Sequence, residues 1–530
     1  MHNQLLLYGD ATAHVAIARR MLDSATPGLS QWGTVWLPLP HLLMLPFVWS
    51  MSWWRSGVAG SVPALAAFVL ATWLLHRIVY RHWGPVAAAW AAAFFALNPS
   101  LLYLAAVPMT ETVYLAAFLG LVDQCDQGHA GRAGCWALAA SLCRYDGWFV
   151  LPFALLALLV SASDLRAAWA RAWRFSLLAM VGPAFWLLYN WWYLNDPLAF
   201  ARGPYSARQI YLHALRHGGI PYPGDHALAL AALYYGKTVA LTAGVPLVLL
   251  ALLGLLLWPR WSKVSPDEAT WTRPEQSGRA LSKFRPQPDP RGPNGAGALG
   301  WEPRQGVLRR AAVLPWLLLL PLPWYLWAMW SGNVPIFLPQ YWPHGYYNLR
   351  YGVQMLPAVA ACSAVFISTL LRGAARLDLP RPAAVARGVG MGLALLCAAG
   401  YALMLRPPGP VSYAEAVHNA PRRLAMEHAL AAALAPREPP QRVLMYYGTY
   451  PGALADDRIP VHSVIQESNF LLWLDALYAP HRYVSWVVVE AGSPVSTMVN
   501  KRDLARYFHP VATLAIPSQP TIEVYRRNDP

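Results

Sequence analysis

The sequence has little charge. Only 13% of its 530 residues are Asp, Glu, Lys or Arg, whereas 56% are hydrophobic. This scarcity excludes an ordinary soluble domain and indicates a membrane protein. The formal net charge of +15 does not indicate a nucleic-acid-binding protein. The basic residues fall in short loops between apolar stretches, as they do on the cytoplasmic side of membrane proteins.

Cysteine is also scarce, and its spacing indicates neither a disulfide scaffold nor a zinc site. The five cysteines lie in or beside apolar stretches: Cys125, Cys135, Cys143, Cys362 and Cys397. The start of the chain, Met1 to Tyr8, has no charged segment and no long apolar run, so we expect no signal peptide. Either the chain begins outside the membrane, or a transmembrane helix precedes Met1 in a longer reading frame.

Apolar stretches near the length that a bilayer requires recur along the chain. We expect spans or half-spans at about 57–80, 84–104, 110–124, 133–143, 147–162, 175–193, 238–258, 311–330, 352–371 and 388–405. Arg77 and Arg81 place the first connecting loop in the cytoplasm, and Arg166, Arg171 and Arg174 mark another cytoplasmic turn. The basic segment 259–310 is rich in Pro and Gly and is expected to be a disordered cytoplasmic loop. Residues 57–405 are therefore the predicted transmembrane helix bundle.

The segments that flank the bundle are expected outside the membrane. Residues 1–56 form the predicted first external loop, with an amphipathic helix capped by Asp10 and an interfacial helix from Trp36 to Trp54 that three prolines interrupt. A second external loop is expected from Asn195 to Lys237. Residues 406–530 combine a helical run with four strand-like pieces, at Arg442 to Tyr447, Trp486 to Glu490, Val511 to Ile516 and Ile522 to Tyr525. The predicted fold class is thus mainly α, a polytopic bundle followed by a small extramembrane α/β domain.

This topology places the candidate functional residues on the external side. They are Asp10, His14, Glu111, Arg144, Asp146, Arg202, Arg208, Lys237, His344 and Arg350. Charged groups at membrane depth are costly, so their convergence suggests a site. Structural explanations stay open for each: Asp10 as a helix cap, Glu111 as a first-turn acid after Thr110, Arg144 neutralised by Asp146, and Arg350 reaching toward the interface.

Four short motifs resemble those of the GT-C membrane glycosyltransferases, most closely the protein O-mannosyltransferase and aminoarabinose transferase type. They are Asp10 before the amphipathic helix, Met109-Thr110-Glu111, Arg144-Tyr145-Asp146-Gly147, and Arg350-Tyr351. The chain departs from many relatives at Ala11, where they carry a second acid, and in its missing first transmembrane helix.

The resemblance implies inverting transfer of a sugar from a polyprenyl-phosphate donor to a lipid, glycan or protein acceptor, at the external face of a bacterial inner membrane. It implies that Asp10 is the general base, that Glu111 orients the acceptor or assists Asp10, and that Arg144, Arg350 and Tyr351 bind the donor phosphate. The acceptor or substrate loop would include His14, Asp146, Arg202, Tyr205, Lys237 and His344. A divalent metal ion stays an open question, because Asp10, His14 and Glu111 are too few ligands to decide. The alternatives are a transporter or flippase, and a non-catalytic membrane scaffold with an external binding domain.

Overall fold

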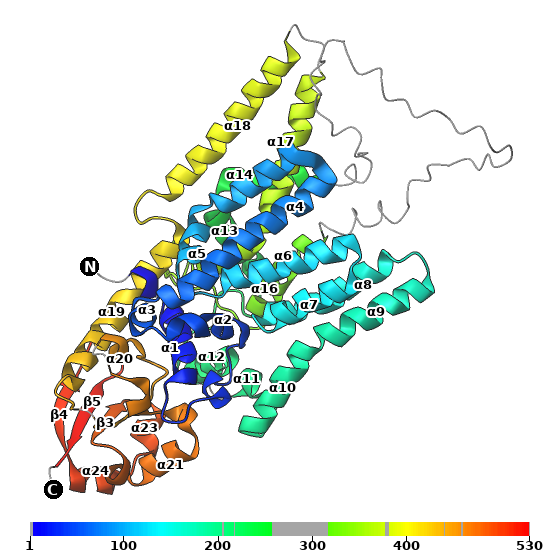
Figure 1. Cartoon of the computed structure of the whole chain (residues 1–530). Coiled ribbons are helices and arrows are strands. Elements are labelled where there is room, and N and C mark those ends of the chain that lie inside the picture. The colour runs from blue at the N-terminus through cyan, green and yellow to red at the C-terminus, as the bar shows by residue number, and fades with distance from the viewer. Residues whose placement is uncertain are drawn as a thin grey trace, which may run out of the picture.

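The computed structural model describes residues 4–203, 206–216, 218–256, 316–376, 381–438, 440–456 and 459–528. Helices form a long bundle, and a small α/β domain lies at the end of the molecule where α1 is also found (Figure 1). This confirms the predicted fold class. The expected loop 259–310 and the candidate Tyr205 lie outside the described residues.

The bundle is built from twelve helices of the described chain. They are α4 (Val58–Ala96), α5 (Pro99–Ala106), α6 (Glu111–Gln127), α7 (Ala130–Ser141), α8 (Tyr145–Val160), α9 (Leu165–Ala179), α10 (Val181–Leu194), α13 (Leu228–Ala243), α14 (Val245–Leu256), α16 (Pro321–Trp330), α17 (Leu356–Ala375) and α18 (Pro382–Met404). Four helical segments are long and apolar enough to cross a membrane, or up to six if the two bent pairs α5–α6 (108°) and α13–α14 (112°) each count as one span.

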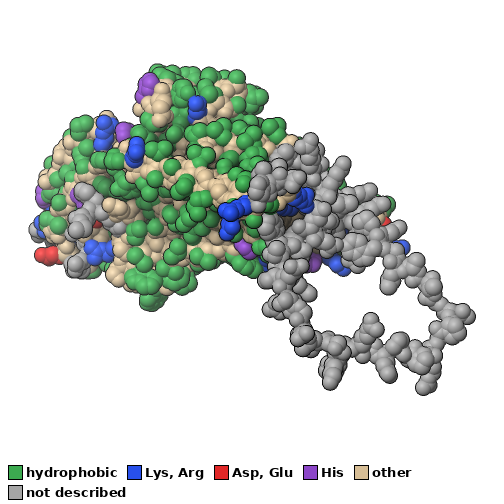
Figure 2. Space-filling model, turned by 90° about the horizontal axis from the view of Figure 1, so that it is seen from above, with side chains coloured by type: hydrophobic (Ala, Val, Ile, Leu, Met, Phe, Trp, Pro, Cys, Tyr) green, Lys and Arg blue, Asp and Glu red, His purple; other side chains and the backbone are tan. Residues whose placement is uncertain are grey.

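The outer surface of the bundle is apolar. Trp169 and Trp192 are 70% and 79% exposed, and many leucines of the other outer helices are exposed as well. Seen from above, apolar side chains cover most of the visible face, with Lys and Arg in a few places only (Figure 2). Such a surface is suited to lipid rather than water, and exposed tryptophans are typical of the membrane interface.

Helix α4 is too long for one span. Its 39 residues would extend roughly 58 Å, about twice the hydrocarbon thickness of a bilayer. Gly84 divides it, because its φ of 80° and ψ of −177° are not helical. Beside this break, Arg77 and Arg81 form ion pairs with Asp123 near the end of α6. Since Glu111 begins α6, this ionic cluster and Glu111 lie at opposite ends of one helix.

Two expectations about helix starts are wrong. Helix α1 (Gly9–Leu22) has Tyr8 rather than Asp10 at its N-cap, because the Asp10 carboxylate pairs with Arg350 instead of the helix N–H groups. The predicted loop 195–237 is also too long. Helix α13 already begins at Leu228, where an apolar run starts, so Lys237 is a helical residue.

Two further boundaries differ from the prediction. The arginines expected in a turn after residue 162 lie on α9, which begins at Leu165 because the Asp164 side chain accepts a hydrogen bond from the Ala167 N–H at 2.8 Å. The span expected at 84–104 is interrupted between α4 and α5, where the Asn98 side chain caps α5 by accepting from the Leu101 N–H at 3.0 Å.

The described chain also contains short elements outside these twelve helices. They are η1 (Gln4–Leu6), η2 (Leu29–Trp32), α2 (Leu39–Val48), α3 (Met51–Ser56), α11 (Ala199–Arg202), α12 (Ala207–Arg216) and η5 (Leu349–Met355). The region expected to be an interfacial helix from Trp36 to Trp54 is therefore two helices, α2 and α3. Ser50 caps α3 and separates the two.

The C-terminal domain contains a five-stranded sheet in the order β2-β1-β3-β5-β4. Its strands are β1 (Val443–Leu444), β2 (Val464–Ile465), β3 (Trp486–Glu490), β4 (Phe508–Leu514) and β5 (Ile522–Arg527), and its helices are α19 (Val411–Leu434), α20 (Gly452–Asp456), η6 (Val461–Ser463), η7 (Glu467–Asn469), α21 (Leu471–Tyr478), α22 (Pro480–Tyr483), α23 (Pro494–Met498) and α24 (Lys501–Tyr507). Strand β1 pairs in parallel with both of its neighbours, β2 and β3. Strand β5 pairs antiparallel with both of its neighbours, β3 and β4. All four predicted strands are present. The sequence reading missed β2, which has only two residues.

The two faces of the sheet pack against different partners. Val487 faces a cluster that includes Trp473 of α21. Trp486 and Val488 face a second cluster, which includes Met426 of α19 and also Val15 of α1. The two ends of the chain therefore share one hydrophobic core, and the helix that carries Asp10 is fixed against the C-terminal domain.

Gly147 allows a test of how closely the bundle is packed at the start of α8. A Cβ atom at this position would lie 2.3 Å from the Ala140 carbonyl oxygen, whereas a Cβ atom at Gly131 would meet no atom within 4 Å. We expect Gly147→Ala to lower the stability by about 1–3 kcal/mol because the backbone must move. Gly131→Ala should leave it unchanged or raise it by up to about 1 kcal/mol. Thermal unfolding of the full chain in detergent measures both, and equal midpoints for the two variants would contradict the close approach.

Candidate active site

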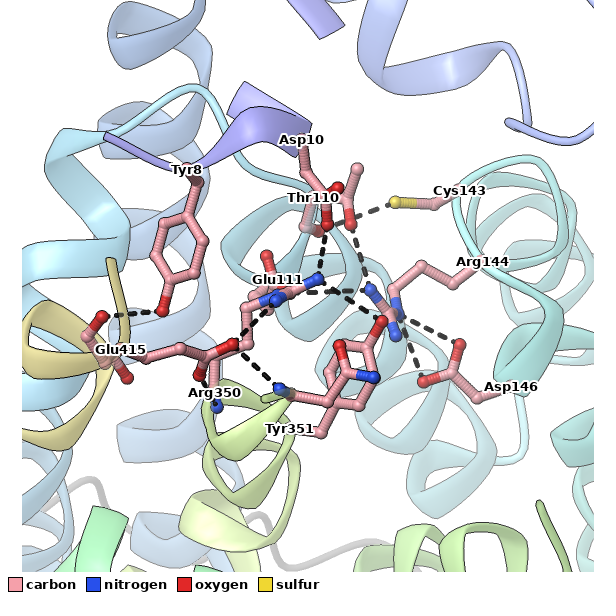
Figure 3. A network of polar contacts seen from close by, with 12 residues as sticks. Tyr8, Asp10, Thr110, Glu111, Cys143, Arg144, Asp146, Arg350, Tyr351 and Glu415 are labelled. Atoms are coloured by element: carbon pink, nitrogen blue, oxygen red, sulfur yellow. Dashed lines mark hydrogen bonds and ion pairs between the residues drawn. The ribbon is translucent and has the colours of Figure 1, made fainter. Parts of the chain in front are cut away.

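Five elements bring ionisable side chains together where the bundle meets the C-terminal domain (Figure 3). They are α1 with Asp10 and His14, α6 with Glu111, the start of α8 with Arg144 and Asp146, η5 with Arg350 and Tyr351, and α19 with Glu415. All of these except Glu415 line one cavity of about 220 Å³. Glu415 lies behind Arg350, on the side away from the cavity.

Arg350 is surrounded by three carboxylates. Its Nε lies 3.2 Å from Glu111 Oε1, its Nη1 lies 3.1 Å from Glu415 Oε1, and its Nη2 donates to Asp10. Glu415 also accepts hydrogen bonds from the backbone N–H groups of Asn348 and Arg350. The side chains of Glu111 and Glu415 are each 1% exposed, whereas that of Asp10 is 41% exposed. Two buried carboxylates therefore hold Arg350, and the third, that of Asp10, lies on the accessible side.

Arg144 has a separate set of partners. Its Nε donates to Asp146 at 3.1 Å, its Nη1 to Thr110 Oγ1 at 3.0 Å, and its Nη2 to the Tyr325 hydroxyl at 3.1 Å. Thr110 occupies the N-cap position of α6 without a capping bond from its side chain, because its hydroxyl accepts from Arg144. These contacts fix the guanidinium at the cavity wall.

Tyr351 and Glu111 link the two arginines. Each guanidinium carbon lies 4.9 Å from the centre of the Tyr351 ring, which is within the range of a cation–π contact. Glu111 Oε1 lies 3.2 Å from Arg350 Nε and 3.6 Å from Arg144 Nη1. Its other oxygen, Oε2, is buried and has no hydrogen-bond partner among the described residues. The arrangement thus presents two cations and an unsatisfied acceptor side by side.

Burial controls the protonation of the groups outside the spans. Burial raises the pKa of Glu415, although Arg350 and two backbone N–H groups oppose the effect. Burial, together with His41, lowers the pKa of His14 well below its ordinary value. His14 is therefore neutral near pH 7. Its Nδ1 lies 2.9 Å from His41 Nε2, and its ring contacts Trp36 with 4.0 Å between centroids.

The remaining candidates lie elsewhere. Arg202, Lys237 and His344 are exposed and do not line this cavity. Tyr205 lies outside the described residues. The structure therefore brings seven of the predicted site residues together and places Arg202, Lys237 and His344 apart from them, while the chemical role of each residue stays a prediction.

The sequence reading missed Glu415 and Tyr325. Glu415 lies in the predicted helical run, four residues after the buried Val411. A charged residue on the apolar side of an amphipathic helix is a signal that could have identified it. Tyr325 lies within the apolar helix α16 and gave no comparable signal.

A metal ion does not fit the side chains found here. Within the described part of the chain, no group of three or more His, Cys, Asp and Glu residues is arranged to hold one. The carboxylates near the cavity have arginine partners instead. Whether the protein uses a divalent metal ion stays an open question.

The fold is that of the GT-C integral-membrane glycosyltransferases. Among solved structures, the chain is similar to ArnT from Cupriavidus metallidurans bound to undecaprenyl phosphate and to the same protein in the apo state. In both comparisons the TM-score is 0.52 and the identity 12%, over 97% of this chain and 93% of ArnT. The archaeal oligosaccharyltransferase AglB from Archaeoglobus fulgidus gives a TM-score of 0.47 at 11% identity, over 97% of this chain and 70% of AglB. No protein-family model and no curated protein sequence matches the chain.

The raised pKa of Glu415 can be tested through the dependence of stability on pH. Because its pKa is raised on folding, its ionisation favours the unfolded state, and its contribution to stability falls as the pH rises above its unfolded pKa of about 4.5. We expect Glu415→Gln to remove this fall. The unfolding midpoint of wild type minus that of the variant should then be larger at pH 4.5 than at pH 7.

The control for this experiment is Glu438→Gln, at an exposed carboxylate in the same domain. Its midpoint should follow the wild type at every pH. A wild-type advantage over Glu415→Gln that grows with pH would show that pairing with Arg350 outweighs burial.

Proposed function

We propose that this chain is a membrane glycosyltransferase that moves a sugar from a polyprenyl-phosphate donor to an acceptor hydroxyl. The observation that carries the proposal is the pair of arginines on the two sides of Tyr351, which open into the same cavity as Asp10. The shared fold with ArnT, whose structure was determined with undecaprenyl phosphate, supports this choice of donor class.

The donor phosphate would bind Arg144 and Arg350. A guanidinium has five N–H groups, and the contacts among the described residues use four of those of Arg350 and three of those of Arg144. At least one N–H group of each arginine is therefore available to phosphate oxygens. Trp324, Tyr325 and Val334 line the same cavity and offer apolar surface to the first part of the lipid chain.

Phosphate binding would also release Asp10. Of the three carboxylates on Arg350, only that of Asp10 is substantially exposed, so it is the partner that an incoming phosphate can replace. Glu111 and Glu415 would hold Arg350 in place during this exchange. The Asp10 carboxylate would then be free to accept a proton from the acceptor.

The reaction follows from this placement. The acceptor oxygen attacks the anomeric carbon, Asp10 takes the hydroxyl proton, and a new glycosidic bond forms with inversion. The bond between the anomeric carbon and the phosphate oxygen breaks, and its electron pair leaves with the polyprenyl phosphate. Arg144 and Arg350 stabilise the charge that develops on this leaving group. Glu111 Oε2, which has no hydrogen-bond partner in the described part of the chain, would accept a hydrogen bond from a sugar hydroxyl and orient it.

The membrane orientation is part of the same proposal. Residues 57–405 would form the transmembrane part in a bacterial inner membrane, with residues 1–56 and 406–530 on the external side. His14 and Asp146 would contact the acceptor inside the cavity, and Arg202, Tyr205, Lys237 and His344 would contact its outer parts. The ionic cluster of Arg77, Arg81 and Asp123 would then lie at the cytoplasmic end.

The transfer itself tests the proposal. Purified protein in lipid is incubated with polyprenyl-phosphate sugars, and the released polyprenyl phosphate is measured. We expect Asp10→Asn to lower the rate by about 10²–10⁴-fold, because the base is lost. Arg144→Ala should lower it by at least about tenfold, because a charge-assisted contact to phosphate contributes about 1.5–3 kcal/mol.

Asp475→Asn and Arg502→Ala, at exposed positions of α21 and α24, are the matched controls and should retain the wild-type rate. An unimpaired Asp10→Asn variant would refute the assignment of the base. Wild-type protein that releases neither sugar nor lipid phosphate from any donor would favour a transporter or a scaffold.

The orientation has its own test. Alkaline phosphatase fused after Pro530 should be active in bacterial cells, because this enzyme requires the oxidising periplasm to form its disulfides. A green fluorescent protein inserted within 259–310 should be fluorescent, as expected of a cytoplasmic location. The opposite pair of results would place the C-terminal domain in the cytoplasm.

A further inference from the structure

A second cavity, of about 470 Å³, lies between the segment after α1 and the C-terminal domain. Its walls are largely aromatic and include Trp32, Trp36, Tyr189, Tyr193, Tyr446 and Phe470. Val35 and Trp36 line this cavity and also the cavity that contains Asp10. The two cavities therefore adjoin at the backbone of residues 35 and 36.

Hydrogen bonds between the two ends of the chain hold the walls together. The Gln31 side chain donates to the Ser468 carbonyl at 2.9 Å and accepts from the Gln466 side chain at 2.8 Å. The Asn469 side chain donates to Thr26 Oγ1 at 2.7 Å. These hydrogen bonds join the segment after α1 to the C-terminal domain beside the cavity.

Two buried polar groups in the walls lack partners. The indole Nε1 of Trp32 and the hydroxyl of Tyr447 have no hydrogen-bond partner among the described residues. Trp32 is only 4% exposed and Tyr447 only 1%. A buried unsatisfied group costs about 1–3 kcal/mol. Two such groups in the walls of one cavity indicate that a ligand with hydrogen-bonding groups completes them.

The cavity also contains one charge of each sign. Arg20 donates through Nε to the Gln31 carbonyl, and Glu467 accepts from the Tyr447 backbone N–H at 2.9 Å. Both side chains line the cavity, and no salt bridge joins them within the described parts of the chain. Burial raises the pKa of Glu467, against the effect of Arg20. The cavity thus has no excess of positive charge that would select a phosphate.

We infer that this cavity binds a saccharide portion of the acceptor. A sugar ring has an apolar C–H face that packs on aromatic side chains and a rim of hydroxyls that donate and accept hydrogen bonds. Such hydroxyls find donors in Trp32 and Arg20, an acceptor in Glu467, and a group that can do both in the Tyr447 hydroxyl. A lipid tail would leave the two buried groups unsatisfied, and an anionic headgroup would meet Glu467.

The position of the cavity sets the direction of the acceptor. A saccharide held here would reach Asp10 past Trp36, whose ring contacts His14. His14 lies four residues after Asp10 on α1 and lines the catalytic cavity with it. The role as acceptor site rests on the proposed function, whereas saccharide binding in this cavity does not.

The test measures binding of cellobiose and chitobiose to the full chain by isothermal titration calorimetry. The protein is held in phosphatidylcholine nanodiscs, because a maltoside or glucoside detergent would itself present a sugar. We expect wild type to bind at least one of the two disaccharides. Trp32→Phe and Tyr447→Phe should each weaken this binding by about 5–10-fold, the effect of one lost hydrogen bond.

Tyr450→Phe is the matched control, because Tyr450 is also a buried tyrosine of this domain but its hydroxyl bonds to Gln519 at 2.9 Å. Its affinity should stay within twofold of wild type. Asp10→Asn should bind the disaccharide as wild type does, although it is expected to be inactive. Absence of binding by wild type, or equal affinities in all variants, would overturn the inference.

The outcome also separates this inference from the proposed function. Disaccharide binding that weakens in Trp32→Phe and Tyr447→Phe, without any sugar transfer by wild type, would leave a saccharide site in a protein that is not a transferase. Sugar transfer with an unchanged acceptor KM in both variants would instead support the transferase and refute the acceptor role of this cavity.

Discussion

The pairing of Arg350 with three carboxylates is the interaction on which the arrangement of the candidate site depends. Its partners come from α1, α6 and α19, so one guanidinium joins the first helix, the bundle and the C-terminal domain. A buried guanidinium needs such partners, because an uncompensated charge in a low-dielectric site costs several kcal/mol. In the structure, this pairing connects helix α1 to the bundle through Asp10.

This cluster is not arranged for stability alone. Asp10, Glu111, Asp146 and Glu415 would contribute four negative charges if ionised, against two positive charges on Arg144 and Arg350, which leaves 2 − 4 = −2. Burial raises the pKa of Glu415 even though Arg350 is beside it. An apolar replacement of similar shape is often as stable as a buried ion pair. The retention of so many charges around one cavity is therefore better explained by chemistry than by folding.

Features of the fold and site that depend on a local sequence pattern were predictable, whereas features that depend on bends or on distant partners were not. Long apolar runs gave the bundle, and β3 was predicted at Trp486 to Glu490 as found, because both signals are local. The break between α4 and α5 and the early start of α13 were missed, because an apolar run does not show where it bends. Asp10, Glu111, Arg144 and Arg350 could be grouped through the side of the membrane alone. Glu415 was not grouped with them, although a charged residue on the apolar side of the predicted C-terminal helical run is a signal for a buried partner.

The C-terminal domain is a component of the site rather than a cover over it. Glu415 reaches Arg350 from α19, and Tyr447 and Glu467 form the wall of the second cavity opposite Trp32. Since Val15 of α1 also packs into the core of this domain, its loss would remove the support of the helix that carries Asp10. Under the proposed function, the apolar side of the cavity that contains Asp10 would bind a lipid-linked donor approaching from the bundle, and the second cavity would bind a polar acceptor approaching from the domain. The two substrates would then meet at Asp10 from opposite directions, as in-line displacement with inversion requires.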